Sequence, residues 1–136
     1  MWWRGSSIST SSQQADGASL TGKRVLIVED SPVVGPFTAD VLEELGCEVL
    51  GPAPNMAAAR QLIDSEQFDA AVMDVHIRGE RVFNLCEALE AKNVPFVLTS
   101  GYADWTMPGK WDERPRLQKP YTIEDVRIAL EGLLAD

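Results

Sequence analysis

Hydrophobic residues along this chain form two alternating patterns: short apolar runs, and longer segments with apolar residues three or four positions apart. The runs RVLIVED, DAAVMD and PFVLTS are nearly continuous, which is typical of strands buried on both faces of a parallel sheet. Together with two weaker candidates, these runs predict five strands, which we place at residues 24–29, 47–50, 69–74, 95–100 and 115–118.

The segments between the runs predict amphipathic helices, because their apolar residues share one face at helical spacing. The four faces comprise Val34, Phe37, Val41 and Leu45; Met56, Ala59, Leu62 and Ile63; Val82, Leu85 and Leu89; and Ile123, Val126, Leu130 and Leu133. Ser31 is the expected N-cap of the first helix and Gly46 its end. Asn55 should cap the second helix, and the pair Thr122 and Asp125 should begin the last one.

Strands and helices alternate, which predicts an α/β fold: a doubly wound five-stranded parallel sheet with helices on both faces. The chain has 45% apolar and 24% charged residues, which suits one globular domain. We expect this domain at residues 23–136. The polar residues 1–22 predict a flexible tail.

Composition excludes several classes of protein. The formal net charge is −9 and the basic residues are dispersed, which disfavours nucleic-acid binding. No apolar run is long enough to span a bilayer, and the first residues do not resemble a secretory signal. Cys47 and Cys86 lie far apart in apolar contexts, so we expect buried free thiols in a reducing cytoplasm.

Chemically active residues gather where the predicted strands end, and this edge of a doubly wound sheet is where ligands bind. A single such residue is most often a loop charge in solvent, but three acids that meet repel by about 4 kcal/mol per pair at 4 Å. A cation must then lie among them, and Mg²⁺ prefers such oxygen ligands. The strand-end residues are Glu29, Asp30, Asp74, Thr99, Ser100 and Lys119.

The motifs VLIVEDSP, AVMDVHIRG, LTSGY and LQKP, in this order and spacing, resemble the signature of response-regulator receiver domains of two-component systems. The resemblance covers residues 23–134. It implies a flavodoxin-like sheet with strand order 2-1-3-4-5. It also implies that Asp74 is the phosphoacceptor, that Glu29 and Asp30 bind Mg²⁺ together with Asp74, and that the backbone carbonyl of His76 completes the metal site.

The remaining site residues follow from the same resemblance. Counting from Pro95, Ser100 matches the hydroxyl that bonds the phosphoryl oxygen, with the neighbouring Thr99 as the alternative. Lys119 matches the lysine of the family, and Pro120 is expected after a cis peptide bond. Ser100 and Lys119 would then stabilise the transition state of phosphoryl transfer to Asp74.

The function implied is that of a cytoplasmic phosphoacceptor in a two-component system or phosphorelay. A sensor histidine kinase or a histidine phosphotransfer protein would donate the phosphoryl group. The chain would promote its own phosphorylation and dephosphorylation without turning over a separate substrate. Because it ends at Asp136, shortly after the last expected helix, we expect a relay, a phosphate sink or a switch that acts through protein contacts.

Two features depart from the common receiver pattern. Arg116 stands where receivers usually carry an aromatic switch residue, and Pro and Gly residues in 101–116 predict a fourth helix that is short or disordered. With PFVLTSGY, these departures resemble the atypical PFxFxTGY subgroup, often paired with HWE-type histidine kinases. Tyr102 could replace the missing aromatic switch and modulate the lifetime of the phosphoryl group, or simply cover the top of the sheet.

Two other functions compete with this interpretation. A degenerate receiver could act as a scaffold that needs no phosphorylation, although the acids and Lys119 are intact. A hydrolase with an aspartyl nucleophile would require a second Asp two residues after Asp74, where this chain has His76.

Overall fold

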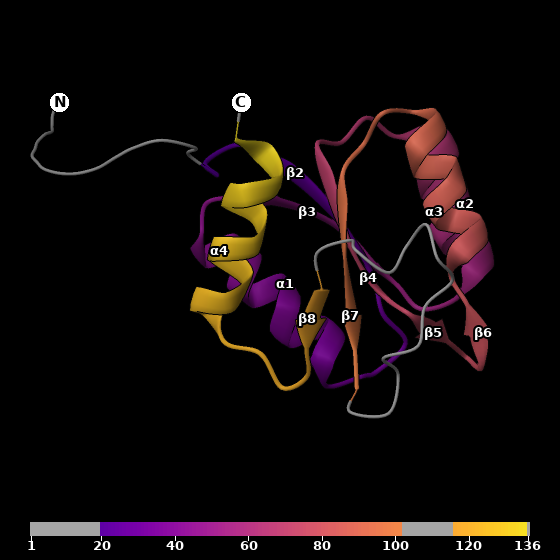
Figure 1. Cartoon of the computed structure of the whole chain (residues 1–136), viewed down its shortest axis with the longest axis horizontal. Coiled ribbons are helices and arrows are strands. Elements are labelled where there is room, and N and C mark those ends of the chain that lie inside the picture. Colours follow the sequence, from indigo (N-terminus) through magenta and orange to yellow (C-terminus); the bar gives the residue numbers. More distant parts are fainter. Residues whose placement is uncertain (1–19, 102–115, 136) are drawn as a thin grey trace, which may run out of the picture.

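Figure 1 shows the computed structural model of the chain, which describes residues 20–101 and 116–135. A parallel sheet of five strands lies between two pairs of helices, with α1 and α4 on one face and α2 and α3 on the other. The elements, in chain order, are β2 (Arg24–Val28), α1 (Val34–Glu44), β3 (Glu48–Ala53), α2 (Met56–Ser65), β4 (Ala70–Asp74), β5 (His76–Ile77), β6 (Glu80–Arg81), α3 (Phe83–Ala91), β7 (Phe96–Ser100), β8 (Arg116–Gln118) and α4 (Ile123–Leu134).

The strand order in the large sheet is β3-β2-β4-β7-β8, and all four pairings are parallel. Counted along the chain, this order is 2-1-3-4-5, so the predicted fold class is confirmed. The winding direction reverses between β2 and β4. The carboxyl ends of these two strands therefore flank the crevice in which doubly wound folds bind their ligands.

The edge strand β3 is longer than predicted, because it continues through Gly51 and Pro52 to Ala53. The prediction ends this strand at residue 50, and the observed strand continues because an edge strand with a bulge tolerates Gly and Pro. The register against β2 shifts at this point. Gly51 has a φ of +94°, and a Cβ there would lie 2.7 Å from the Ile27 carbonyl oxygen, so the close approach requires glycine.

The first helix differs from the prediction at its start and on its buried face. It begins at Val34, and the Ser31 hydroxyl accepts hydrogen bonds from the backbone N–H groups of Val33 (3.2 Å) and Val34 (3.0 Å). Phe37, expected in the core, is 43% exposed, whereas Thr38 is buried. Thr38 can be buried because its hydroxyl bonds the Val34 carbonyl, at 2.9 Å, and the Tyr121 hydroxyl, at 2.8 Å.

The other predicted helix ends are confirmed. The Asn55 side chain accepts a hydrogen bond from the Ala58 N–H at 2.8 Å, and Thr122 and Asp125 form a capping box. Helix α1 ends at Glu44 with Leu45 as its C-cap, and Gly46, with a φ of +93°, comes directly after this cap. Ile123, the first residue of α4, is 36% exposed and so lies outside the core face on which we placed it.

The part of the chain that the structure describes begins before the predicted domain boundary at residue 23. Leu20, assigned to the tail, is buried against the α1 and α4 face, and the Gly22 N–H donates to the Gly46 carbonyl.

Both cysteines are buried and free, as predicted. No helix within residues 20–101 and 116–135 is long and apolar enough to cross a membrane. Residues 1–19 of the expected tail, Tyr102 and the expected irregular fourth helix lie outside the described residues.

Candidate functional site

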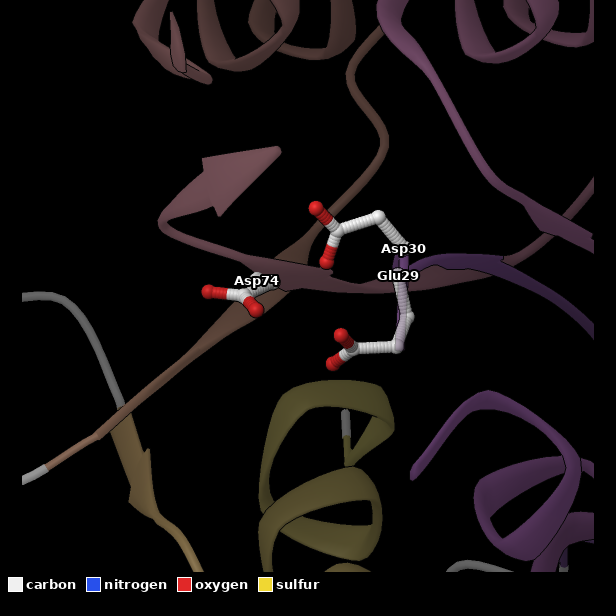
Figure 2. Close-up of side chains that lie close together, drawn as sticks. All are labelled: Glu29, Asp30 and Asp74. Carbon is white, nitrogen blue, oxygen red and sulfur yellow. The ribbon is translucent and has the colours of Figure 1, made fainter. Parts of the chain in front are cut away.

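Three carboxylates meet at the carboxyl ends of β2 and β4. Glu29 and Asp30 follow β2 directly, and Asp74 is the last residue of β4, the neighbouring strand. Figure 2 shows the side chains of Glu29 and Asp30 extending from consecutive residues toward Asp74. One carboxylate oxygen from each of the three residues lies within 4.8 Å of the others. The predicted acidic cluster therefore exists in the folded chain.

Lys119 supplies positive charge to this cluster from the other side of β7. Its Nζ lies 2.7 Å from Asp74 Oδ2 and 3.0 Å from Glu29 Oε1. Its backbone N–H donates to the Ser100 carbonyl at 2.9 Å, which continues the pairing of β8 with β7 and directs the residue toward the crevice. The Lys119–Pro120 peptide bond is cis, as the resemblance implies.

Each carboxylate also accepts a hydrogen bond from a backbone N–H. The donors are Ser31 to Glu29 Oε2 at 3.0 Å, His76 to Asp74 Oδ1 at 3.0 Å, and Arg78 to Asp30 Oδ2 at 2.7 Å. These bonds orient the acids and partly compensate their charges. His76 begins β5 two residues after Asp74, so its backbone borders the cluster; metal binding by its carbonyl stays a prediction.

Burial and charge shift two pKa values at the site. Burial raises the pKa of Glu29 above its usual value, and the Asp74 charge adds to this, although the hydrogen bond from Lys119 opposes it. Burial alone would lower the pKa of Lys119, but the hydrogen bonds to Asp74 and Glu29 outweigh it, and the pKa is raised. The Lys119 side chain therefore stays protonated at neutral pH.

Two hydroxyl groups at the end of β7 are buried without a hydrogen-bond partner. They belong to Thr99, which is the register partner of Asp74, and to Ser100, which is the register partner of Gln118. An unpaired buried hydroxyl is costly and points to a partner that is absent from the free chain. Both candidates for the hydroxyl role therefore lie at the end of β7, the strand that pairs with β4, and the choice between Ser100 and Thr99 stays a prediction.

The donor set fits Mg²⁺. The three acids offer hard oxygen ligands from two adjacent strand ends, and one lysine leaves the cluster with an excess of negative charge. Mg²⁺ is usually bound by one or two carboxylates together with water and phosphate oxygens, so this cluster has the required chemistry.

Comparison with known proteins identifies the family. Residues 25–130 match the response regulator receiver domain. The structure is similar to SdrG from Sphingomonas melonis Fr1, with 37% sequence identity, a TM-score of 0.76, and coverage of 87% of this chain and 99% of that chain. It is also similar to the BeF3-activated conformation of SdrG from Pseudomonas melonis Fr1, with 35% identity, a TM-score of 0.73, and coverage of 85% and 98%.

Among curated proteins, the transcriptional regulatory protein PdtaR of Mycobacterium tuberculosis is 27% identical over 124 residues. This alignment covers 85% of the chain but only 58% of PdtaR, so the chain spans little more than half the length of that relative. The matched residues include the three acids of the cluster and Lys119. The chain therefore belongs to the response regulator receiver domain family.

Proposed function

We propose that this receiver domain accepts a phosphoryl group on Asp74 from a phosphohistidine of a sensor histidine kinase or a phosphotransfer protein. The observation that carries the proposal is the ammonium group of Lys119, which bridges Asp74 and Glu29 beside the third acid, Asp30. A carboxylate nucleophile, a cation-binding cluster and a fixed positive charge thus occupy one crevice.

In the proposed step, a carboxylate oxygen of Asp74 attacks phosphorus while the bond from phosphorus to the imidazole nitrogen breaks. The imidazole keeps the electron pair, and Asp74 becomes an acyl phosphate. Lys119 holds Asp74 in place and stabilises the charge on the transferring group, and a hydroxyl of Ser100 or Thr99 donates to a phosphoryl oxygen. Mg²⁺ held by Glu29, Asp30 and Asp74, with the His76 carbonyl, would neutralise negative charge on the phosphoryl oxygens.

The wider function is part of the same proposal. The relative SdrG has been described in a BeF3-activated conformation, which supports a phosphoacceptor role here. We propose a cytoplasmic signalling protein that turns over no separate substrate, binds neither nucleic acid nor membrane, and acts through a downstream protein partner. The PFVLTSGY segment supports a place in the atypical PFxFxTGY subgroup and an HWE-type kinase as donor.

Phosphorylation with and without the metal tests the proposal. A small phosphodonor with Mg²⁺ should add one phosphoryl group to the chain, and a chelator in excess should abolish this, because the acids would then repel the donor. Intact-mass spectrometry measures the addition, and beryllofluoride should shift the amide resonances of the same crevice. If the protein gains no phosphoryl group with Mg²⁺ from any donor, the scaffold function is favoured instead.

A pair of substitutions decides which hydroxyl acts. Ser100→Ala should slow phosphorylation by about 10-fold, because the transition state loses one hydrogen bond worth about 1.4 kcal/mol. Thr99→Val, which keeps the shape of the side chain, should change the rate little. The rate is measured with a small phosphodonor at saturating Mg²⁺. The reverse order of the two effects would transfer the role to Thr99.

A further inference from the structure

Arg78 connects three loops at the carboxyl edge of the sheet. It lies at the tip of the β5–β6 hairpin, and its backbone N–H donates to Asp30 Oδ2 at 2.7 Å. Its side chain donates from Nε to the carbonyl of Pro54 at 3.1 Å. Asp30 belongs to the loop after β2, and Pro54 to the loop before α2. One residue thus joins the hairpin to both loops.

The conformation of the two-residue hairpin turn directs the Arg78 N–H toward Asp30. Ile77 pairs with Glu80, which leaves Arg78 and Gly79 as a two-residue turn with φ values of +52° and +80°. Two positive φ values are typical of a type I′ turn, in which Asn or Gly is preferred at the first position. Arginine is unfavourable in this conformation, so contacts outside the turn must stabilise it.

Asp30 depends on this bond more than the other two acids depend on theirs. Lys119 orients Glu29 and Asp74 in addition to their backbone donors. Within residues 20–101 and 116–135, the bond from Arg78 is the one hydrogen bond that the Asp30 side chain accepts. Movement of the turn would therefore change the direction of the Asp30 carboxylate.

We infer that Arg78 is a positioning residue for the metal site: its side chain anchors the turn to Pro54, and its N–H thereby orients Asp30 toward bound Mg²⁺. This inference rests on the proposed function. Partners that orient metal ligands change metal affinity without touching the metal. Arg78 differs from Lys119 in how it acts. The ammonium group of Lys119 contacts Glu29 and Asp74 directly, whereas the Arg78 side chain bonds the Pro54 carbonyl and acts on Asp30 through the turn.

The sign of the effect separates positioning from simple electrostatics. The guanidinium is a positive charge near a cation site, so Coulomb repulsion alone predicts that its removal tightens Mg²⁺ binding. Positioning predicts the opposite. Arg78→Ala loses the anchor and keeps the unfavourable positive φ, so Mg²⁺ affinity of the unphosphorylated protein should fall about 10-fold.

Arg78→Gly is the second variant, and it adopts the turn without strain. It loses only the anchor to Pro54, so its Mg²⁺ affinity should fall about 3-fold, less than that of the alanine variant. Arg60→Ala is the charge-matched control. Arg60 lies on α2 with a side chain that is 52% exposed and an ion pair with Asp64 at 3.9 Å, so its loss should leave the affinity nearly unchanged.

Calorimetric titration of each variant of the 136-residue chain with MgCl₂ measures the affinity, and thermal unfolding with a chelator verifies the fold. If the alanine variant does not fold, the Mg²⁺ affinities of Arg78→Gly and Arg60→Ala are compared instead, and a lower affinity of Arg78→Gly supports the positioning role. If the wild-type protein binds Mg²⁺ and the Arg78 variants bind it equally or more tightly, this inference alone is wrong. Wild-type protein that does not bind Mg²⁺ would overturn the proposed function and this inference with it.

Discussion

Replacing Asp74 with asparagine should abolish phosphorylation and leave the fold intact. An amide has no anionic oxygen with which to attack phosphorus. Asp74 is the acid at the end of β4, whereas the other two acids follow β2, so neither can take its position. The fold should persist because Asn has nearly the same shape and Lys119 keeps its contact with Glu29 at 3.0 Å. Removal of one of three mutually repelling charges also offsets the loss of the Lys119–Asp74 contact.

Intact-mass spectrometry after incubation with a small phosphodonor and Mg²⁺ measures this loss. Asp64→Asn is the matched control, because Asp64 undergoes the same chemical change on the exposed face of α2 and should leave phosphorylation at the wild-type level. Thermal unfolding shows whether both variants are folded. Phosphorylation of the Asp74 variant at the wild-type level would assign the acceptor to another residue.

Replacing Lys119 with methionine should lower both the phosphorylation rate and the stability of the metal-free protein. The Glu29 and Asp74 side chains are only 3% and 9% exposed, and both would lose their cation. Loss of one partner of a buried pair costs about 3 kcal/mol or more, but the Lys119 side chain is 22% exposed, so we expect about 2 kcal/mol. The rate should fall about 100-fold, because the transferring group loses a fixed positive charge.

The pH dependence of the same variant has a defined sign. The pKa of Lys119 is raised above 10.5 by its bonds to Asp74 and Glu29, which outweigh burial. Its contribution to stability is therefore complete below pH 10.5 and is lost as the pH rises through the raised pKa. The difference in unfolding free energy between wild type and Lys119→Met should accordingly shrink at alkaline pH.

Denaturant unfolding in a chelator gives the free energies, and Lys23→Met, which removes a lysine outside the site, is the control. Mg²⁺ should restore part of the stability of the Lys119 variant, since it places positive charge among the same carboxylates. Equal stability of wild type and Lys119→Met at neutral pH without metal would contradict the inference that Lys119 compensates the buried acids.

The sequence alone was sufficient for features that depend on near neighbours in the chain. The apolar runs identified β2, β4 and β7, because a strand buried on both faces requires continuous hydrophobic residues. The caps at Asn55 and at Thr122 with Asp125 were predictable because donor and acceptor are three residues apart. The acids and Lys119 could be placed at one edge of the sheet because parallel strands align their carboxyl ends.

Only the tertiary structure decided the features that depend on residues distant in sequence. Phe37, expected in the core, is exposed, and Thr38 is buried because the Tyr121 hydroxyl, 83 positions away, completes the hydrogen bonds of this threonine. The edge position of β3 and the close approach of Ile27 allow that strand to continue through Gly51. The bond from Arg78 to Asp30 joins residues 48 positions apart, which local spacing cannot predict because packing alone brings the two loops together.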